Sequence, residues 1–301
     1  MREWLEYALV WAALKSLGTL PRAVARAVAG GAARFLFVFL GKFRRVAMFN
    51  LRLAFPDWTD KQRRGVIRKM VRNLGWMAAE FAQFPRWTPK NVERIVVLDG
   101  HENFLAGANR GKGVIFLTGH MGAWEVSSFA HALYGFPLYF LARQLDNRRV
   151  DALINRYRCL AGNQPIFKNE SARATLKILR ESGTVGILAD QNTLPEEGIF
   201  VAFFGTPACT TTGIARLALH TDAAVVPGYA WWDDAIRKYR LRFEPPVEVV
   251  RTGDAGTDIR VNTENFTRVI EEFARKHPDQ WLWAHARWKT RPAGEKPLYP
   301  F

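Results

Sequence analysis

The sequence predicts an α/β fold with a mainly parallel central sheet covered by helices, preceded by a helical N-terminal region. Beyond residue 90, short apolar and β-branched runs alternate with amphipathic stretches, which is the pattern of parallel strands joined by helices. Before residue 90, the apolar residues instead crowd stretches that are rich in Trp, Phe and Ala and have helical character. Pro85 and Pro89 mark the boundary between the two regions, so we divide the chain into residues 1–90 and 91–301.

The expected elements follow from these runs and from the turn residues between them. We expect strands at Gly113–Leu117, Pro137–Leu141, Thr184–Ala189 and Ala223–Tyr229, with Tyr239–Phe243 as an antiparallel edge. We expect helices near Ala123–Tyr134, Arg148–Leu160, Ser171–Glu181, Thr212–His220 and Asn262–Lys276. The strands are short and bounded by turn residues, whereas the helices carry their apolar residues on one side.

Composition limits the class of partner and the compartment. The 301 residues carry a formal net charge of +15, with a sequence pI near 10.2. Such a charge indicates an anionic partner, which is a nucleic acid, an anionic membrane or an acidic protein. The two cysteines, Cys159 and Cys209, are far apart and expected on different helices. They have the spacing of neither a disulfide framework nor a metal site, so we expect a reducing compartment.

Two apolar stretches open the chain. The first begins beside Glu3 and Glu6, and the second, residues 23–41, is interrupted by Arg26 and Arg34. A spanning helix needs about 20 mostly apolar residues, and acidic residues at the start disfavour a cleaved signal peptide. We therefore expect residues 1–90 to form a membrane-associated helical region, interfacial or a marginal single anchor. An internal helical hairpin of a soluble protein is the alternative.

A basic run follows the second apolar stretch. Two acids, Asp57 and Asp60, stand among ten basic residues, which are Lys42, Arg44, Arg45, Arg52, Lys61, Arg63, Arg64, Arg68, Lys69 and Arg72. A solvated surface explains many charge runs. Directly after an aromatic, apolar segment, however, such a run indicates contact with an anionic leaflet, on the cytoplasmic side.

Polar residues end three of the expected strands. His120 follows the first strand, Arg143 the second, and Asp190-Gln191 the third. Because ligands of open α/β sheets bind beyond the carboxyl ends of the strands, a base, a cation and an acid–amide pair are expected along one edge. The sequence therefore places the candidate site there.

His120 and Glu125 are the strongest candidates for chemistry. On one continuous helix, positions five apart differ by about 140° and share no face. The pair therefore makes sense if His120 lies in the strand-to-helix turn and Glu125 in the first helical turn. Glu125 can then hold one ring nitrogen while the other accepts a proton from a hydroxyl. The alternative is an ordinary turn histidine with a carboxylate near a helix N-terminus.

Further side chains suit an oxyanion and an apolar substrate. Arg143 is a candidate for binding a phosphate or an oxyanion, or pairs locally with an aspartate. Backbone N–H groups near Gly122 are expected to receive the oxyanion with it. Phe200, Phe203 and Phe204 offer a wall for an acyl chain, or core packing. The remaining histidines lack partners at ligand spacing, so we expect no metal and no cofactor.

Four motifs occur together in one order along the chain. They are Gly119-His-Met-Gly-Ala-Trp-Glu125, Ala142-Arg143 followed by Asn147 and Asp151, Ala189-Asp-Gln191, and Trp281-Leu-Trp-Ala-His-Ala-Arg287. With these motifs the chain resembles the bacterial late acyltransferases of lipid A biosynthesis, within the wider lysophospholipid acyltransferase-like group. The resemblance covers nearly the whole chain.

The resemblance implies transfer of a fatty acyl group to a hydroxyl of a lipid A precursor, at the cytoplasmic face of the cell inner membrane. The donor it implies is a thioester of acyl carrier protein or coenzyme A, and the acceptor is a glycolipid on an anionic membrane surface. It implies His120 as base with Glu125 as its partner. The substrate-binding residues expected from it are Arg143, Asn147, Asp151, Asp190, Gln191 and Arg287.

Alternatives remain open at this point. Within enzymes, the acceptor could be another lipid, such as a phosphatidylinositol mannoside, an ornithine lipid or a lysophospholipid. The charge alone also permits a nucleic-acid-binding protein, whose affinity would fall steeply with salt. The sequence lacks a recognition motif for it and opens with apolar helices, so we expect no nucleic acid partner. An inert membrane-associated scaffold is the third alternative and would consume no thioester.

Overall fold

The computed structural model describes residues 1–167 and 171–299. The described helices are α1 (Arg2–Thr19), α2 (Arg22–Phe39), α3 (Gly41–Ala54), α4 (Asp60–Gln83), α5 (His101–Ala108), α6 (Trp124–Leu133), α7 (Arg148–Arg158), α8 (Ser171–Arg180), α9 (Gly213–Thr221) and α10 (Ala255–Lys276). The strands are β1 (Val96–Asp99), β2 (Val114–Thr118), β3 (Tyr139–Ala142), β4 (Gln164–Phe167), β5 (Thr184–Leu188), β6 (Gly198–Phe203), β7 (Thr206–Thr211), β8 (Ala224–Asp233) and β9 (Lys238–Phe243).

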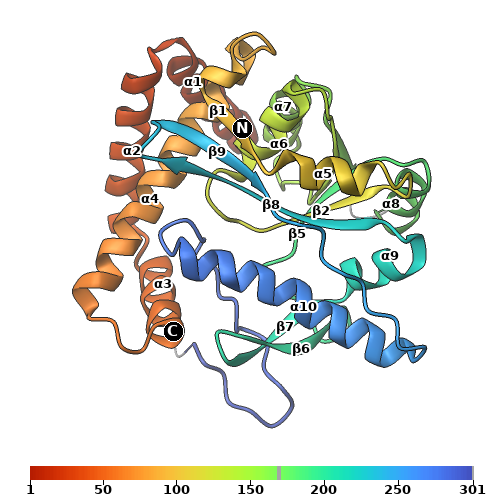
Figure 1. The fold of residues 1–301 in the computed structure, drawn as a ribbon. Coiled ribbons are helices and arrows are strands. Elements are labelled where there is room, and N and C mark those ends of the chain that lie inside the picture. Colours follow the sequence, from red (N-terminus) through yellow and green to blue (C-terminus); the bar gives the residue numbers. More distant parts are fainter. Residues whose placement is uncertain (168–170, 300–301) are drawn as a thin grey trace.

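A seven-stranded sheet with the order β1-β9-β8-β2-β5-β3-β4 forms the centre of the fold (Figure 1). Its neighbours run parallel apart from β8 and β9, which are antiparallel. Helices cover both faces, so the predicted α/β architecture with a mainly parallel sheet is confirmed. The strands β6 and β7 form a separate antiparallel hairpin beneath the sheet, next to α10.

Strand β2 is buried on both faces because alternate side chains enter two different cores. Ile115 and Leu117 join the core on the side of α10, α9 and the β6–β7 hairpin. Val114 and Phe116 join the other core, which α5, α6 and the end of α4 cover. This double burial explains the continuous apolar run of β2, and it fixes the position of the turn that follows the strand.

Several predicted elements need correction. Strand β9 is antiparallel to β8 as predicted, but β1 pairs with it on the outer side, so β9 is not an edge. Strands β1 and β4, which form the two ends of the sheet, and the β6–β7 hairpin were not predicted. Cys209 lies on strand β7 and Cys159 caps the end of α7, so neither lies within a helix. Helix α10 starts at Ala255, because Asp254 caps its N-terminus, earlier than the predicted start.

The N-terminal helices pack closely around α4. Gly75 lets α2 approach α4, since a Cβ there would lie 2.5 Å from the carbonyl oxygen of Ala29. Arg26, which interrupts the second apolar stretch, points inward between the rings of Trp76 and Trp232, at 3.8 and 3.7 Å from their centroids. None of the described helices, taken singly, is long and apolar enough to cross a bilayer, whereas α2 and α3 together pass that test of length and composition, with a bend of 93° between them.

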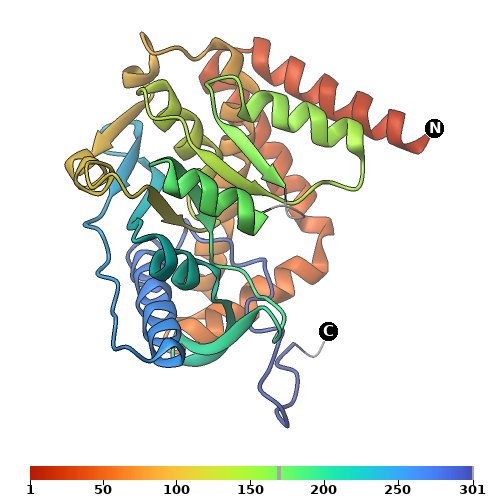
Figure 2. The same ribbon diagram turned by 90° about the vertical axis from the view of Figure 1, so that its right-hand side faces the viewer.

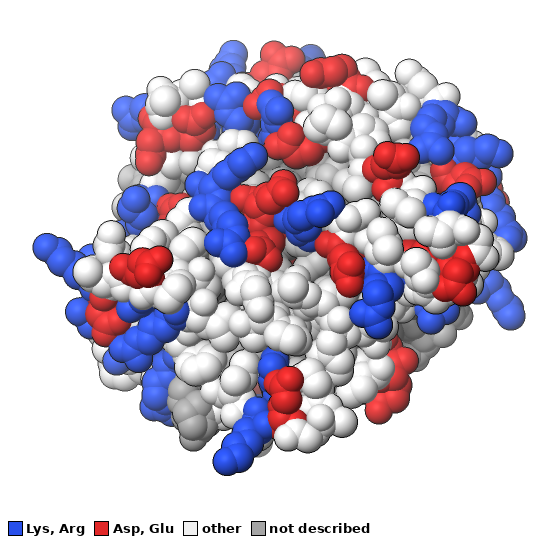
Figure 3. Space-filling model, turned by 60° about the horizontal axis from the view of Figure 1, so that its bottom comes forward, with Lys and Arg blue, Asp and Glu red and all other residues white. Residues whose placement is uncertain are grey.

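Charge is mixed on the face at the bottom of Figure 1. Basic and acidic side chains alternate around an uncharged centre there (Figure 3). This face therefore does not carry the single-sign stripe that a nucleic-acid backbone requires.

Candidate active site

His120 and Asp190 meet where two neighbouring strands end. Strands β2 and β5 are paired in parallel with Thr118 opposite Leu188, and each chain continues two residues to the side chain in question. The imidazole Nδ1 of His120 consequently lies 2.9 Å from Oδ1 of Asp190. The glycine between strand and histidine makes room for this contact, since a Cβ on Gly119 would lie 2.9 Å from the carboxyl carbon of Asp190.

The predicted hydrogen bond between Glu125 and His120 is wrong. Glu125 lies in the first turn of α6 as expected, but it pairs with Arg158 of α7 through both carboxylate oxygens. One of these contacts, from the guanidinium Nε, is 2.9 Å long. The carboxylate that holds the imidazole is instead that of Asp190, one of the predicted substrate-binding residues.

Asp190 is held rigidly from behind. Its Oδ2 accepts a hydrogen bond of 2.8 Å from the indole Nε1 of Trp281, and the residue is only 3% exposed. Burial raises the pKa of this carboxyl, but attraction and hydrogen bonding from His120 outweigh burial, so the pKa is lowered. Asp190 is therefore an ionised group behind the histidine, not a substrate contact.

The same interactions set the state of the imidazole. Burial lowers the pKa of His120, but the charge of Asp190 and the hydrogen bond to it outweigh burial and raise the pKa above the ordinary value of 6.5. An ionised Asp190 accepts a hydrogen bond from Nδ1–H, so the lone pair of the neutral ring lies on Nε2. The side-chain amide nitrogen of Gln191 lies 3.3 Å from this Nε2. Gln191 thus contacts the ring nitrogen that Asp190 leaves free.

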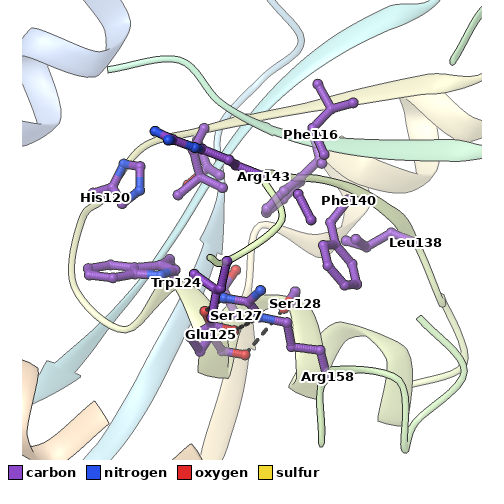
Figure 4. A pocket seen from close by; sticks show the side chains of 16 residues that line it. Phe116, His120, Trp124, Glu125, Ser127, Ser128, Leu138, Phe140, Arg143 and Arg158 are labelled. Atoms are coloured by element: carbon purple, nitrogen blue, oxygen red, sulfur yellow. Dashed lines mark hydrogen bonds and ion pairs between the residues drawn. The ribbon is translucent and has the colours of Figure 1, made fainter. Parts of the chain in front are cut away.

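A cavity of about 230 Å³ opens in front of this pair (Figure 4). His120, Trp124 and Arg143 lie toward one side of it, and Phe116, Leu138 and Phe140 lie toward the other. Its lining residues are Phe116, Thr118, His120, Trp124, Glu125, Ser127, Ser128, Leu138, Phe140, Leu141, Ala142, Arg143, Leu145, Arg158, Gly186 and Leu188. The cavity therefore joins a base and two arginines to an apolar interior.

The strand ends meet as the sequence predicts. Strand β3 pairs with β5 and β5 with β2, all in parallel, so Arg143 beyond β3 reaches the same edge as His120. Arg143 is exposed and lines the cavity. Of the two roles expected for the aromatic residues, core packing holds for Phe203 and Phe204, which are buried beside Trp281 and Trp283. Phe200 does not line the cavity either. The apolar wall comes from strands β2, β3 and β5 instead.

Asn147 and Asp151 support the loop that carries Arg143. The Asn147 side chain caps α7 by accepting from the amides of residues 149 and 150, and it donates to Glu3 and Glu6 of α1. Figure 2 shows α1 running beside α7 as these bonds require. Asp151 accepts from the amide of Leu145, at 3.0 Å. Neither lines the cavity, so direct substrate binding by these two residues stays a prediction.

Arg287, predicted to bind substrate, has a different position in the structure. It is 1% exposed and donates to the carbonyl of Cys209, at 2.7 Å, and to the hydroxyl of Thr210. Burial lowers its pKa to about 10. Arg287 therefore joins the C-terminal segment to strand β7 and is too deeply enclosed to contact a substrate.

The predicted oxyanion donors near Gly122 are already occupied. The amide of Gly122 donates to Gln280 and that of Ala123 to Ala230, both at 2.7 Å. Gly122 has a φ of +58°, and a Cβ there would lie 1.9 Å from the carbonyl oxygen of Ala230, so glycine is required. The N–H groups of the first turn of α6, from Trp124 onward, have no partner inside the helix and are the better candidates.

Three contributors to the site were not predicted. Arg158 holds Glu125, and Trp281 holds Asp190. The imidazole of His285 accepts from the amide of Asn192, at 3.0 Å, and burial lowers its pKa to about 4, so the ring is neutral and fixes the loop after Asp190. Trp281 and His285 lie in the C-terminal motif, which is their only sequence signal. Within the described residues, no group of three His, Cys, Asp or Glu side chains is arranged to hold a metal ion.

A partly exposed imidazole, paired with a buried carboxylate beside an apolar cavity, suits an enzyme that deprotonates a hydroxyl next to a hydrophobic substrate. A family model described as bacterial lipid A biosynthesis acyltransferase matches residues 1–290. The chain belongs to this family, whose activity is acyl transfer.

Curated relatives agree with the family assignment. The lipid A biosynthesis lauroyltransferase of Escherichia coli (strain K12) is 26% identical over 302 residues, which cover 98% of this chain and 94% of the relative. The lipid A biosynthesis myristoyltransferase of the same strain is 27% identical over 268 residues, which cover 87% and 82%. Among solved structures, the 1-acyl-sn-glycerophosphate (LPA) acyltransferase PlsC from Thermotoga maritima matches with a TM-score of 0.38 and 15% identity, over 84% of this chain and 98% of that chain.

Proposed function

We propose that this enzyme moves a fatty acyl chain from a thioester of acyl carrier protein or coenzyme A to a hydroxyl of a lipid A precursor. The observation that carries the proposal is His120, which lines an apolar cavity while Asp190 holds its Nδ1. The names of the curated relatives support this acceptor class.

The reaction follows from this geometry. Nε2 of His120 accepts the proton of the acceptor hydroxyl as the oxygen attacks the thioester carbonyl. Asp190 stabilises the imidazolium that forms. The tetrahedral oxyanion is received by Arg143 and by amides of the first turn of α6. When the intermediate collapses, the C–S bond breaks, and the thiolate takes the proton from His120, so the new ester and a free thiol are formed.

Substrate placement follows from the polarity of the cavity. The acyl chain lies along Phe116, Leu138 and Phe140, and the thioester lies at the side of His120 and Arg143. Glu125 and Arg158 form an ion pair on the cavity wall beside Ser127 and Ser128. This pair orients polar substrate atoms without acting as the base.

The basic, apolar N-terminal region supports action at the cytoplasmic face of the cell inner membrane. Exposed apolar side chains on α1 include Trp4, Leu5, Leu9 and Trp11. An excess of positive charge attracts both an anionic leaflet and an acidic carrier protein. Fractionation of cells that express the full chain tests this location. Recovery in the cytosolic fraction, with none in inner membranes, would contradict it.

The decisive experiment combines purified full chain with acyl-carrier-protein and coenzyme A thioesters and with lipid A precursors. We expect thiol release that depends on the acceptor and a lipid product heavier by one acyl group in mass spectrometry. Replacement of His120 by Ala lowers turnover by about 10²–10⁴-fold. Turnover with a lysophospholipid, an ornithine lipid or a phosphatidylinositol mannoside in place of the lipid A precursor would refute the acceptor and keep the reaction type.

A further inference from the structure

A second large cavity lies between α2, α3 and α4, outside the reaction site. It has a volume of about 570 Å³ and shares no lining residue with the cavity in front of His120. Its lining residues are Arg34, Phe37, Val38, Arg44, Arg45, Met48, Arg64, Ile67, Arg68 and Val71. The proposed reaction leaves this cavity without a role.

The polar part of this cavity is entirely cationic. Five of the ten lining residues are arginines, and among these ten described residues none is acidic. Arg44 uses one nitrogen to cap the carbonyl of Val38 at the end of α2, at 2.7 Å. Arg64 and Arg68 are one helical turn apart on α4 and exposed. Like charges gathered around one hollow repel each other, and a bound anion relieves that repulsion. Guanidinium groups match the geometry of phosphate oxygens.

The floor of the same cavity is apolar. Phe37 of α2, Met48 of α3, and Ile67 and Val71 of α4 form it. An inorganic anion or a nucleic-acid backbone gains nothing from such a floor, whereas an acyl chain removes apolar surface from water on it. The ligand that fits both parts therefore carries a phosphate and a hydrocarbon chain.

Apolar side chains are exposed around the cavity. The end of α2 and the start of α3 expose large apolar side chains, which are Phe35, Leu36, Val38, Phe39, Leu40 and Phe43, from 45% to 70% exposed. These residues surround the bend of 93° between the two helices. Aromatic and aliphatic residues beside arginines are the arrangement of an interfacial membrane contact.

We infer that the cavity between α2, α3 and α4 binds an anionic phospholipid of the leaflet, with its phosphate among the arginines and an acyl chain over Ile67 and Val71. The inference deepens the membrane part of the proposed function. It assigns the α2–α3 bend as the corner that enters the headgroup layer. The bound lipid fixes the depth and orientation of the enzyme at the surface.

The test uses a soluble lipid and needs no acyl transfer. The purified full chain is titrated by calorimetry with dihexanoyl phosphatidylglycerol, below its micelle concentration. We expect saturable binding of one lipid per chain. Dihexanoyl phosphatidylcholine, which has the same chains and no net charge, and inorganic phosphate, which has no chains, should each bind at least tenfold more weakly.

Four variants locate the site. R64Q/R68Q removes two arginines, and its affinity should fall by about thirtyfold. R94Q/R260Q removes two exposed arginines elsewhere and should bind within twofold of the parent. I67W keeps the charge, fills the floor and should abolish binding. H120A should bind normally, which separates this site from the reaction site. Circular dichroism and thermal unfolding confirm the fold of each variant.

Other results of these titrations would contradict the inference. Equal binding of the two short-chain lipids, or equal loss in both double variants, would show attraction by net charge alone and overturn the site. Phosphate that binds as tightly as phosphatidylglycerol would overturn the lipid assignment. An absence of thioester turnover, with lipid binding intact, would refute the proposed reaction and leave this inference standing.

Discussion

Replacing Asp190 by Asn tests the identity of the carboxylate that activates His120. The substitution keeps the shape of the side chain and removes one acceptor. In the native site, Oδ2 accepts from Trp281 and Oδ1 accepts from His120. Asparagine has one oxygen, and the indole N–H cannot accept a hydrogen bond. The amide oxygen is therefore expected to face Trp281, and the amide NH₂ then faces Nδ1 of His120.

This orientation inverts the tautomer of the imidazole. Nδ1 becomes the acceptor, so the proton lies on Nε2, and Nε2 cannot take a proton from the acceptor hydroxyl. A wrong tautomer with unchanged geometry costs about 10⁴-fold in the analogous position of a serine protease triad. We expect D190N to lower kcat/KM by about 10³–10⁴-fold. The assay follows thiol release from the acyl thioester, with the lipid product identified by mass spectrometry.

A second substitution makes the prediction sharper. Trp281→Phe removes the indole donor that selects the orientation of the asparagine. In D190N/W281F the amide is free to turn its oxygen toward His120, which restores the productive tautomer. We expect the double variant to be about tenfold more active than D190N. Without the indole donor, the orientation that gives the wrong tautomer leaves the amide oxygen unpaired, and an unpaired buried polar group costs about 1–3 kcal/mol. W281F alone should keep most of its activity, and thermal unfolding should show that all three variants fold.

The contrast with Glu125 decides between the two carboxylates. Glu125→Gln leaves the hydrogen bond between Asp190 and His120 in place, so it should cost far less than D190N. A parental rate in D190N, a greater loss in E125Q, or a double variant no better than D190N would refute the reasoning.

Three further predictions concern the same site. The acid limb of kcat/KM should have its midpoint above pH 6.5, because the pKa of His120 is raised and the ring is protonated and inactive at pH values below that pKa. In the residual activity of D190N this midpoint should move to lower pH. An unmoved midpoint would contradict the assignment of Asp190. G119A should destabilise the fold by about 1–3 kcal/mol and slow turnover, because the added methyl group meets the side chain of Asp190. The control is G31A on α2, where the added methyl group has open space around it and thermal unfolding should be unchanged. R143A should lower kcat by about 10²-fold, with R143K partly active; an effect on KM alone would make Arg143 a binding residue rather than an oxyanion contact.

Local sequence patterns were sufficient to predict the sheet and the edge at which the candidate site lies. The apolar run of β2 indicates burial on both faces, and polar residues at 120, 143 and 190 end three such runs. Parallel strands place their carboxyl ends together wherever they lie in the sheet. Local pattern did not reveal β1 and β4 at the two ends of the sheet, nor the β6–β7 hairpin.

The sequence by itself determined the fold class and the sheet edge at which His120, Arg143 and Asp190 gather, because burial and strand ends leave a local imprint on residue type. Only the tertiary structure decided which carboxylate meets that histidine. The order of the strands puts β5 against β2, which brings residue 190 to residue 120, while α7 supplies Arg158 and turns Glu125 away. Contacts across 70 residues depend on how elements pack, and no short-range pattern records that choice.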